Sequence, residues 1–72
     1  MTLAQGELGK EYTIVRVDTE DEELNDFLLT LGCYEGEKIV LVSFVSESFV
    51  VAIRDGRYNI NQELAEAIVV AE

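Results

Sequence analysis

The sequence lacks histidine, proline and tryptophan, and it has a single cysteine among its 72 residues. Without histidine it lacks the commonest general base and the commonest transition-metal ligand. The serines at 43, 46 and 48 have no evident base to activate them. One cysteine cannot close an internal disulfide, so nothing indicates an oxidising compartment. We therefore expect no enzyme, no catalytic residue and no cofactor.

Basic residues are also scarce. Five Lys and Arg face fifteen Asp and Glu, which gives a net charge of −10. Binding to nucleic acid depends on clustered basic side chains, and docking on anionic lipid does so too. The charge is compatible instead with attraction to a basic patch on another protein.

Long hydrophobic runs are missing as well. No apolar run approaches the length that crosses a bilayer, and residues 1–12 do not have the basic and apolar regions of a signal peptide. We expect a cytoplasmic protein with no direct membrane insertion.

The chain nevertheless has the composition of a folded protein, since 49% of it is hydrophobic. Its length predicts a single domain, residues 1–72, with a thin core. Runs rich in β-branched residues predict five strands, at 12–17, 39–45, 49–54, 58–60 and 67–70. Leu3 and Leu8 are expected to plug the core from the N-terminal segment. We expect one hairpin loop at 46–48 and another at Asp55-Gly56, a dipeptide that favours positive φ.

A helix is predicted after the first strand. The stretch DTEDEELND, residues 18–26, contains six carboxylates, which suit the positive end of a helix dipole. Thr19 is expected to cap the helix, with Glu22 completing a capping box. An apolar stripe and then Gly32, a common helix terminator, follow; the stripe comprises Leu24, Phe27, Leu28 and Leu31. A shorter helical turn, capped by Asn61, is expected at 61–66.

The acidic stretch does not predict a metal site. Counted from Asp18, the sixth and twelfth positions of a calcium loop would be Glu23 and Leu29, where glycine and an acid are needed. Carboxylate pairs on a convex helix surface hold a divalent ion weakly. Cys33 is interpreted as a small buried hydrophobe. No metal ligand is predicted.

Several stretches together resemble the FeoA family of bacterial ferrous iron transport. They are LLTLGCYEGEKI at 28–39, VAIRDGRYNI at 51–60 and ELAEAIVV at 63–70, and the similarity extends over essentially the whole chain. The family usually has proline where this chain has Glu35, and often another near Ser48. These departures affect the turns locally.

The resemblance implies a mainly β fold: a small SH3-like five-stranded barrel with one α-helix after the first strand and a short helical turn before the last. It also implies a non-enzymatic accessory protein that binds the cytoplasmic region of FeoB, the ferrous iron transporter. The family has no established catalytic residues or metal ligands, so none are carried over. Two alternatives remain open: an iron-handling protein that uses surface carboxylates and Cys33, and a general SH3-like interaction domain unrelated to iron.

The partner-binding surface is expected at Phe44 and Phe49 of the first hairpin, together with Tyr34. The strands at 39–45 and 49–53 are apolar at nearly every position. One face can fill the core, and part of the other needs cover from another element or a partner. In the alternative, a thin barrel uses both faces internally.

Overall fold

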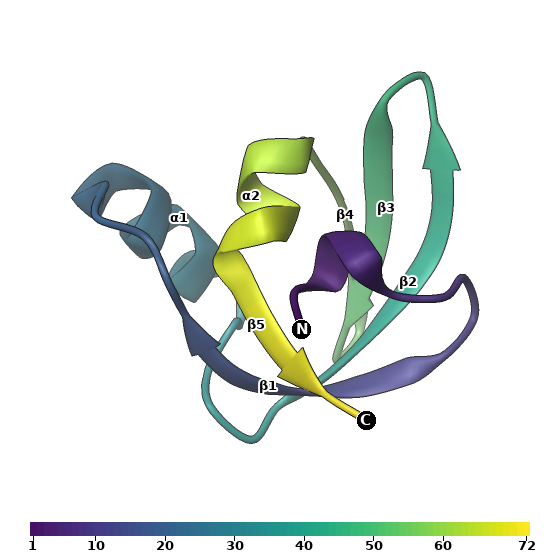
Figure 1. Ribbon diagram of the computed structural model, residues 1–72, viewed down its shortest axis with the longest axis horizontal. Helices are drawn as coiled ribbons and strands as arrows, with labels where there is room; N and C mark the ends of the chain where they lie inside the picture. Colours follow the sequence, from purple (N-terminus) through teal and green to yellow (C-terminus); the bar gives the residue numbers. More distant parts are fainter.

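A computed structural model describes all residues, 1–72 (Figure 1). Its five strands are connected by short turns and two α-helices, after a 3₁₀ turn, η1, near the N-terminus. In chain order the elements are η1 (Leu3–Gln5), β1 (Glu11–Val17), α1 (Glu22–Leu31), β2 (Lys38–Val45), β3 (Ser48–Ile53), β4 (Gly56–Ile60), α2 (Gln62–Ala67) and β5 (Ile68–Ala71). The strand limits differ from the expected ones by one or two residues.

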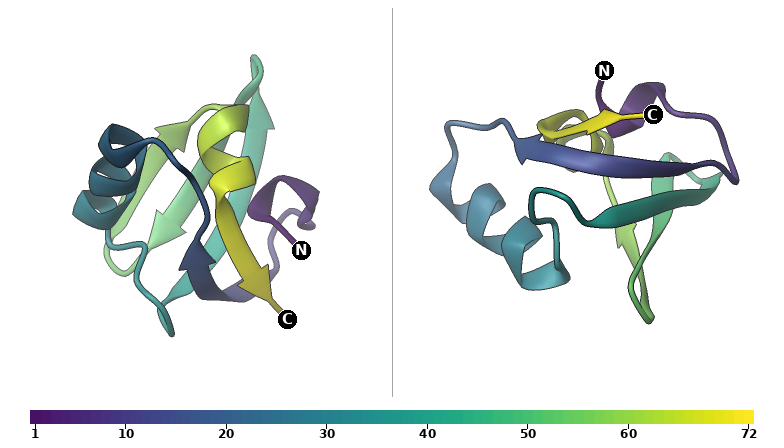
Figure 2. Two further views of the ribbon diagram at one scale, coloured as in Figure 1. Left: turned by 60° about the vertical axis from the view of Figure 1, so that its left-hand side comes forward. Right: turned by 90° about the horizontal axis from the view of Figure 1, so that it is seen from below.

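The strands form one antiparallel sheet in the order β4-β3-β2-β1-β5. The sheet curls around a core, and the two helices lie at its side and across it (Figures 1 and 2). This confirms the mainly β, SH3-like fold with its helix after the first strand and its short helix before the last. The edge strands β4 and β5 do not pair, so the barrel is open along that seam.

The core consists of 16 buried residues, all of them apolar or aromatic, or the cysteine. Leu3 is fully buried, as predicted. Leu8 is not: its side chain is 60% exposed. It lies in a surface turn, where Gly9 has a φ of +81° and donates its N–H to the Leu41 carbonyl. That turn directs the chain into β1 and leaves the Leu8 side chain outside.

The start of α1 differs from the prediction. Asp21, not Thr19, is the N-cap, and one carboxylate oxygen accepts from the N–H groups of Glu23 and Leu24. Thr19 instead accepts a hydrogen bond from the Asp21 N–H. Aspartate and threonine are both favoured N-cap residues, and the carboxylate of Asp21, which also gains from the helix dipole, occupies the cap. The helix ends at Gly32 with a φ of +105°, as predicted.

The apolar stripe of α1 is narrower than expected. Leu28 is fully buried, and Leu24 and Leu31 pack against the core. Phe27 is exposed. The helix lies beside the barrel and not over it, so only one narrow line of side chains reaches the core (Figures 1 and 2).

The β3–β4 turn is shifted by one residue from the prediction. Its two residues are Arg54 and Asp55, and Arg54 has the positive φ, +54°. Gly56 already belongs to β4 and pairs with Ile53. A Cβ at Gly56 would lie 2.6 Å from Cζ of Tyr58. Glycine at position 56 therefore leaves space for that ring, and the positive φ of the turn is adopted by Arg54 instead.

The short helix α2 is capped as predicted, since the Asn61 side chain accepts from the Leu64 N–H. It leads directly into β5. Neither helix has the length and apolar character needed to span a bilayer.

Candidate functional site

The tip of the β2–β3 hairpin owes its shape to a bulge in β2. Leu41 pairs with Val51, but the next pair is Ser43 with Val50, so Val42 is an extra residue. Cross-strand partners lie on the same face of a sheet. The bulge therefore turns Ser43 away from the inner face.

The same bulge places Phe44 opposite Phe49. Their rings stack, with centroids 4.7 Å apart and planes 14° from parallel. Phe49 is 7% exposed and belongs to the core, whereas Phe44 is 46% exposed. Of the two phenylalanines predicted for the partner-binding surface, Phe44 is accessible and Phe49 supports it from beneath.

The hairpin turn itself is strained. Ser46 and Glu47 form the two-residue loop, and their φ angles are +51° and +66°. This left-handed region is costly for residues other than glycine and favours Asn-Gly in such turns. The turn fixes the position of Glu47 at the tip.

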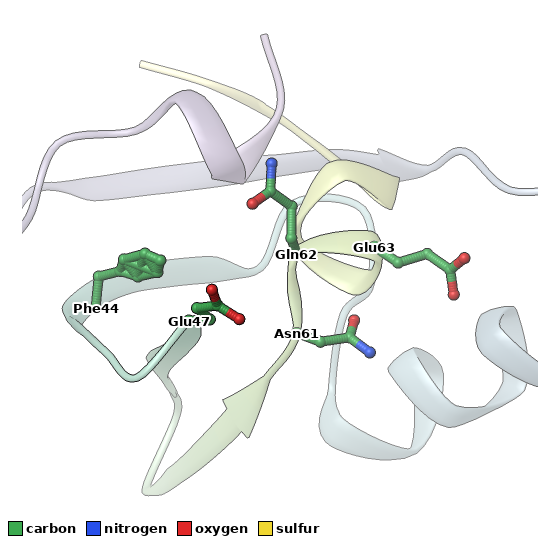
Figure 3. A pocket seen from close by; sticks show the side chains of 5 residues that line it. All are labelled: Phe44, Glu47, Asn61, Gln62 and Glu63. Atoms are coloured by element: carbon green, nitrogen blue, oxygen red, sulfur yellow. The ribbon is translucent and has the colours of Figure 1, made fainter.

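The start of α2 lies beside this tip because β4 ends there. Ile60, its last residue, pairs with Phe49, so residues 61–63 emerge next to the hairpin. Between the two elements is an open hollow of about 650 Å³ (Figure 3). It is lined by Phe44, Glu47, Asn61, Gln62 and Glu63.

Tyr34 lies elsewhere. It precedes β2, whereas Phe44 is near the other end of that strand, so the structure does not join the two in one site. Tyr34 is 49% exposed and lines a second hollow of about 350 Å³ between the end of α1 and the β3–β4 turn. There Arg54 pairs with Glu37 and lowers the pKa of that carboxyl, first through the hydrogen bond and then by its charge.

Cys33 and the acidic stretch form no cluster. Cys33 is buried at the end of α1, and burial raises the pKa of its thiol to about 11. Asp21 is occupied as a helix cap, and Asp18 lies 3.8 Å from Arg16. No group of three or more Cys, Asp or Glu side chains in the structure is placed to hold a metal ion.

Two features of the hairpin site were not predicted from the sequence: the bulge in β2, and the approach of Gln62 to the hairpin tip. Ser43 could have indicated the bulge, because this polar residue stands where the alternation of inward-facing apolar residues begun by Ile39 and Leu41 would place another apolar one. The approach of Gln62 depends on the pairing of β3 with β4. The outer positions of the hairpin, such as Val40 and Val50, are half-buried, so this face is covered in part by the chain itself.

A family model described as FeoA domain matches residues 1–72. Solved structures with the same fold include FeoA from Stenotrophomonas maltophilia complexed with zinc, described as an SH3 domain protein and a possible ferrous iron transport activating factor. It is 22% identical with a TM-score of 0.89, over 99% of this chain and 89% of that one. No curated protein sequence matches significantly.

Two further structures extend the comparison. Iron(II) transport protein A from Clostridium thermocellum is 25% identical, with a TM-score of 0.87 over 97% of this chain and 44% of that one. A manganese-dependent transcriptional repressor in complex with manganese is 19% identical, with a TM-score of 0.88 over 99% of this chain but 35% of the repressor. The fold thus also occurs as a part of longer regulatory proteins.

Proposed function

Because the chain belongs to the FeoA family, which is associated with ferrous iron transport, we propose that it is a non-enzymatic cytoplasmic accessory that binds the cytoplasmic region of a FeoB-type transporter. The observation that supports this proposal is the exposed aromatic tip of the β2–β3 hairpin. A ring that is 46% exposed and already ordered by stacking is suited to a protein contact.

The tip has the properties of an interface anchor. Phe44 is held by Phe49 beneath it, so little side-chain entropy remains to be lost on binding. Val45 beside it is also exposed, which extends the apolar surface. Tyr34, at the other end of β2, is proposed as a second, separate contact.

Charge supports a basic partner. The net charge of −10 would attract basic groups on the transporter from a distance, and salt would screen that attraction. The apolar contact at Phe44 would instead control dissociation. We therefore expect association to slow as salt rises, with a smaller change in the dissociation rate.

The test is binding of the purified protein to the purified cytoplasmic region of the transporter from the same organism, measured by biolayer interferometry at several salt concentrations. Phe44→Ser should weaken binding about tenfold or more, as loss of an interface anchor does. Leu8→Ser is the matched control, because Leu8 is also apolar and exposed but lies in the turn before β1. Phe49 is left unchanged because its removal would damage the core.

Tyr34→Ser tests the second contact in the same assay. Circular dichroism must show that each variant is folded. Absence of binding by the parent protein up to about 1 mM would contradict the accessory function. Unchanged binding by Phe44→Ser would place the interface elsewhere. GTP hydrolysis by the purified protein alone would contradict the non-enzymatic assignment.

A further inference from the structure

We propose that the hollow between the β2–β3 hairpin and α2 is a binding site for an arginine side chain of a basic partner. This deepens the proposed function by naming the group that the tip recognises. The inference rests on the hollow's aromatic wall, on two acceptors that face it and on the absence of any basic residue in its lining.

Phe44 forms the aromatic wall. One face of its ring is covered by Phe49, so the exposed part of the ring is what lines the hollow. Figure 3 shows the ring projecting from β2 toward α2. A cation placed over an aromatic face is attracted by the ring quadrupole, and arginine does this more often than lysine.

Glu47 supplies the negative charge. The ion pairs of the protein involve Glu72, Asp18 and Glu37, so the Glu47 carboxylate has no cationic partner. Figure 3 shows it directed toward α2 from the turn. The left-handed φ of Glu47 sets the direction in which its side chain leaves the turn.

Gln62 supplies a second acceptor. Its Nε2 donates to Glu66 over 3.1 Å, which leaves Oε1 on the side that faces the hairpin (Figure 3). The other polar side chains of the lining contribute less. Asn61 already accepts from the Leu64 N–H, and the Glu63 carboxylate points to the far side of α2.

This combination fits a guanidinium group better than an ammonium group. A guanidinium is planar, stacks on aromatic rings and has five N–H donors that can reach two acceptors at once. An ammonium group is a compact point charge that neither stacks nor spans separate acceptors in a plane. The acidity of the whole molecule adds long-range attraction for a basic segment.

The experiment is a titration of the ¹⁵N-labelled full chain with the peptide acetyl-Gly-Arg-Gly-amide, followed by amide chemical shifts. Shifts should concentrate at 44–48 and 61–63. The same peptide with citrulline, which is planar but neutral, should bind at least about tenfold more weakly. The lysine peptide should also bind more weakly than the arginine peptide.

Two variants test the assigned groups. Glu47→Gln should weaken arginine binding on the order of tenfold, since it removes the charged acceptor and keeps the shape. Phe44→Leu should weaken arginine binding several-fold, because it removes the aromatic ring but keeps an apolar side chain at this half-exposed position. Glu20→Gln is the matched control, because it removes one charge near the start of α1 and should leave binding unchanged.

Shifts spread over the acidic surface, equal binding of the citrulline or lysine peptide, or an unaffected Glu47→Gln variant would each overturn the arginine site. The transporter assay separates the two proposals. If the transporter region binds the parent protein and Glu47→Gln equally well, the accessory function stands and the arginine site does not. If the arginine peptide binds as described while the transporter region does not, the site stands and the accessory function falls.

Discussion

Among single residues, Cys33 links the core to the pH of the surroundings. Its thiol is buried, and burial alone raises its pKa from 9.0 to about 11. In the unfolded chain the same thiol ionises near its ordinary pKa. The native state therefore holds the proton over a pH range in which the unfolded state releases it, and stability falls as pH rises through that range.

We expect the free energy of unfolding to fall by about 2 kcal/mol between pH 9 and pH 11 because of this group. The measurement is urea denaturation at several pH values, and the comparison is Cys33→Ala, which lacks the titrating group. The variant should be less stable at neutral pH but should lose less of its stability over this range. Parallel curves for the two proteins would show that the thiol is not responsible.

Asp21 stabilises α1 through its two hydrogen bonds to the first turn. Asp21→Ala should lower the free energy of unfolding by about 1 kcal/mol, the typical effect of a lost N-cap. Thr19→Ala should have a clearly smaller effect, because Thr19 receives a single bond outside the helix. Chemical denaturation measures both. Equal losses would mean that the two residues share the capping function.

At the level of elements, the β2–β3 turn carries strain that substitution can relieve. Ser46 and Glu47 both have positive φ, where Asn-Gly is the preferred pair. The double variant Ser46→Asn, Glu47→Gly should therefore raise the free energy of unfolding by about 1 kcal/mol. Ser48→Asn is the control, since Ser48 lies in β3 and outside the turn.

The same double variant should lose affinity for the arginine peptide, because it removes the Glu47 carboxylate. Higher thermal stability combined with weaker binding would show that Glu47 lowers the stability of the turn but contributes to binding. A melting temperature equal to or below that of the parent protein would contradict the reading of this turn as strained.

How far sequence predicts an element depends on how local its causes are. The end of α1 at Gly32 and the cap of α2 by Asn61 could be predicted, because each depends on a few neighbouring residues. The position of Gly56 could not, since Tyr58 and not the turn requires glycine there. The Val42 bulge and the hollow depend on strand register, which residues far apart in the sequence decide. The sequence therefore predicted a site at this hairpin, but it did not predict that Glu47 and Gln62 would line the hollow beside it.

For the whole molecule, we predict that bound metal does not contribute to folding. No three potential ligands converge, Cys33 is buried with its proton, and Asp21 is engaged as a cap. Adding a chelator should leave the melting temperature unchanged within error. A ligand that binds the native state alone raises its stability by mass action, so a loss of several degrees on chelation would reveal a site. Calorimetry with and without chelator makes the measurement.

The strand order also determines when the chain can fold during its synthesis. β1 lies between β2 and β5, so the first strand to leave the ribosome needs a neighbour that leaves much later. Until Ile68–Ala71 emerges, β1 has one unpaired edge, and Ile14 lacks its partner Val70. An exposed strand edge is a template for wrong pairing, and closing so long a loop slows folding. The nascent chain therefore passes through an aggregation-prone stage in which β1 is incompletely paired. The net negative charge of its many carboxylates helps to keep neighbouring chains apart by repulsion at this stage.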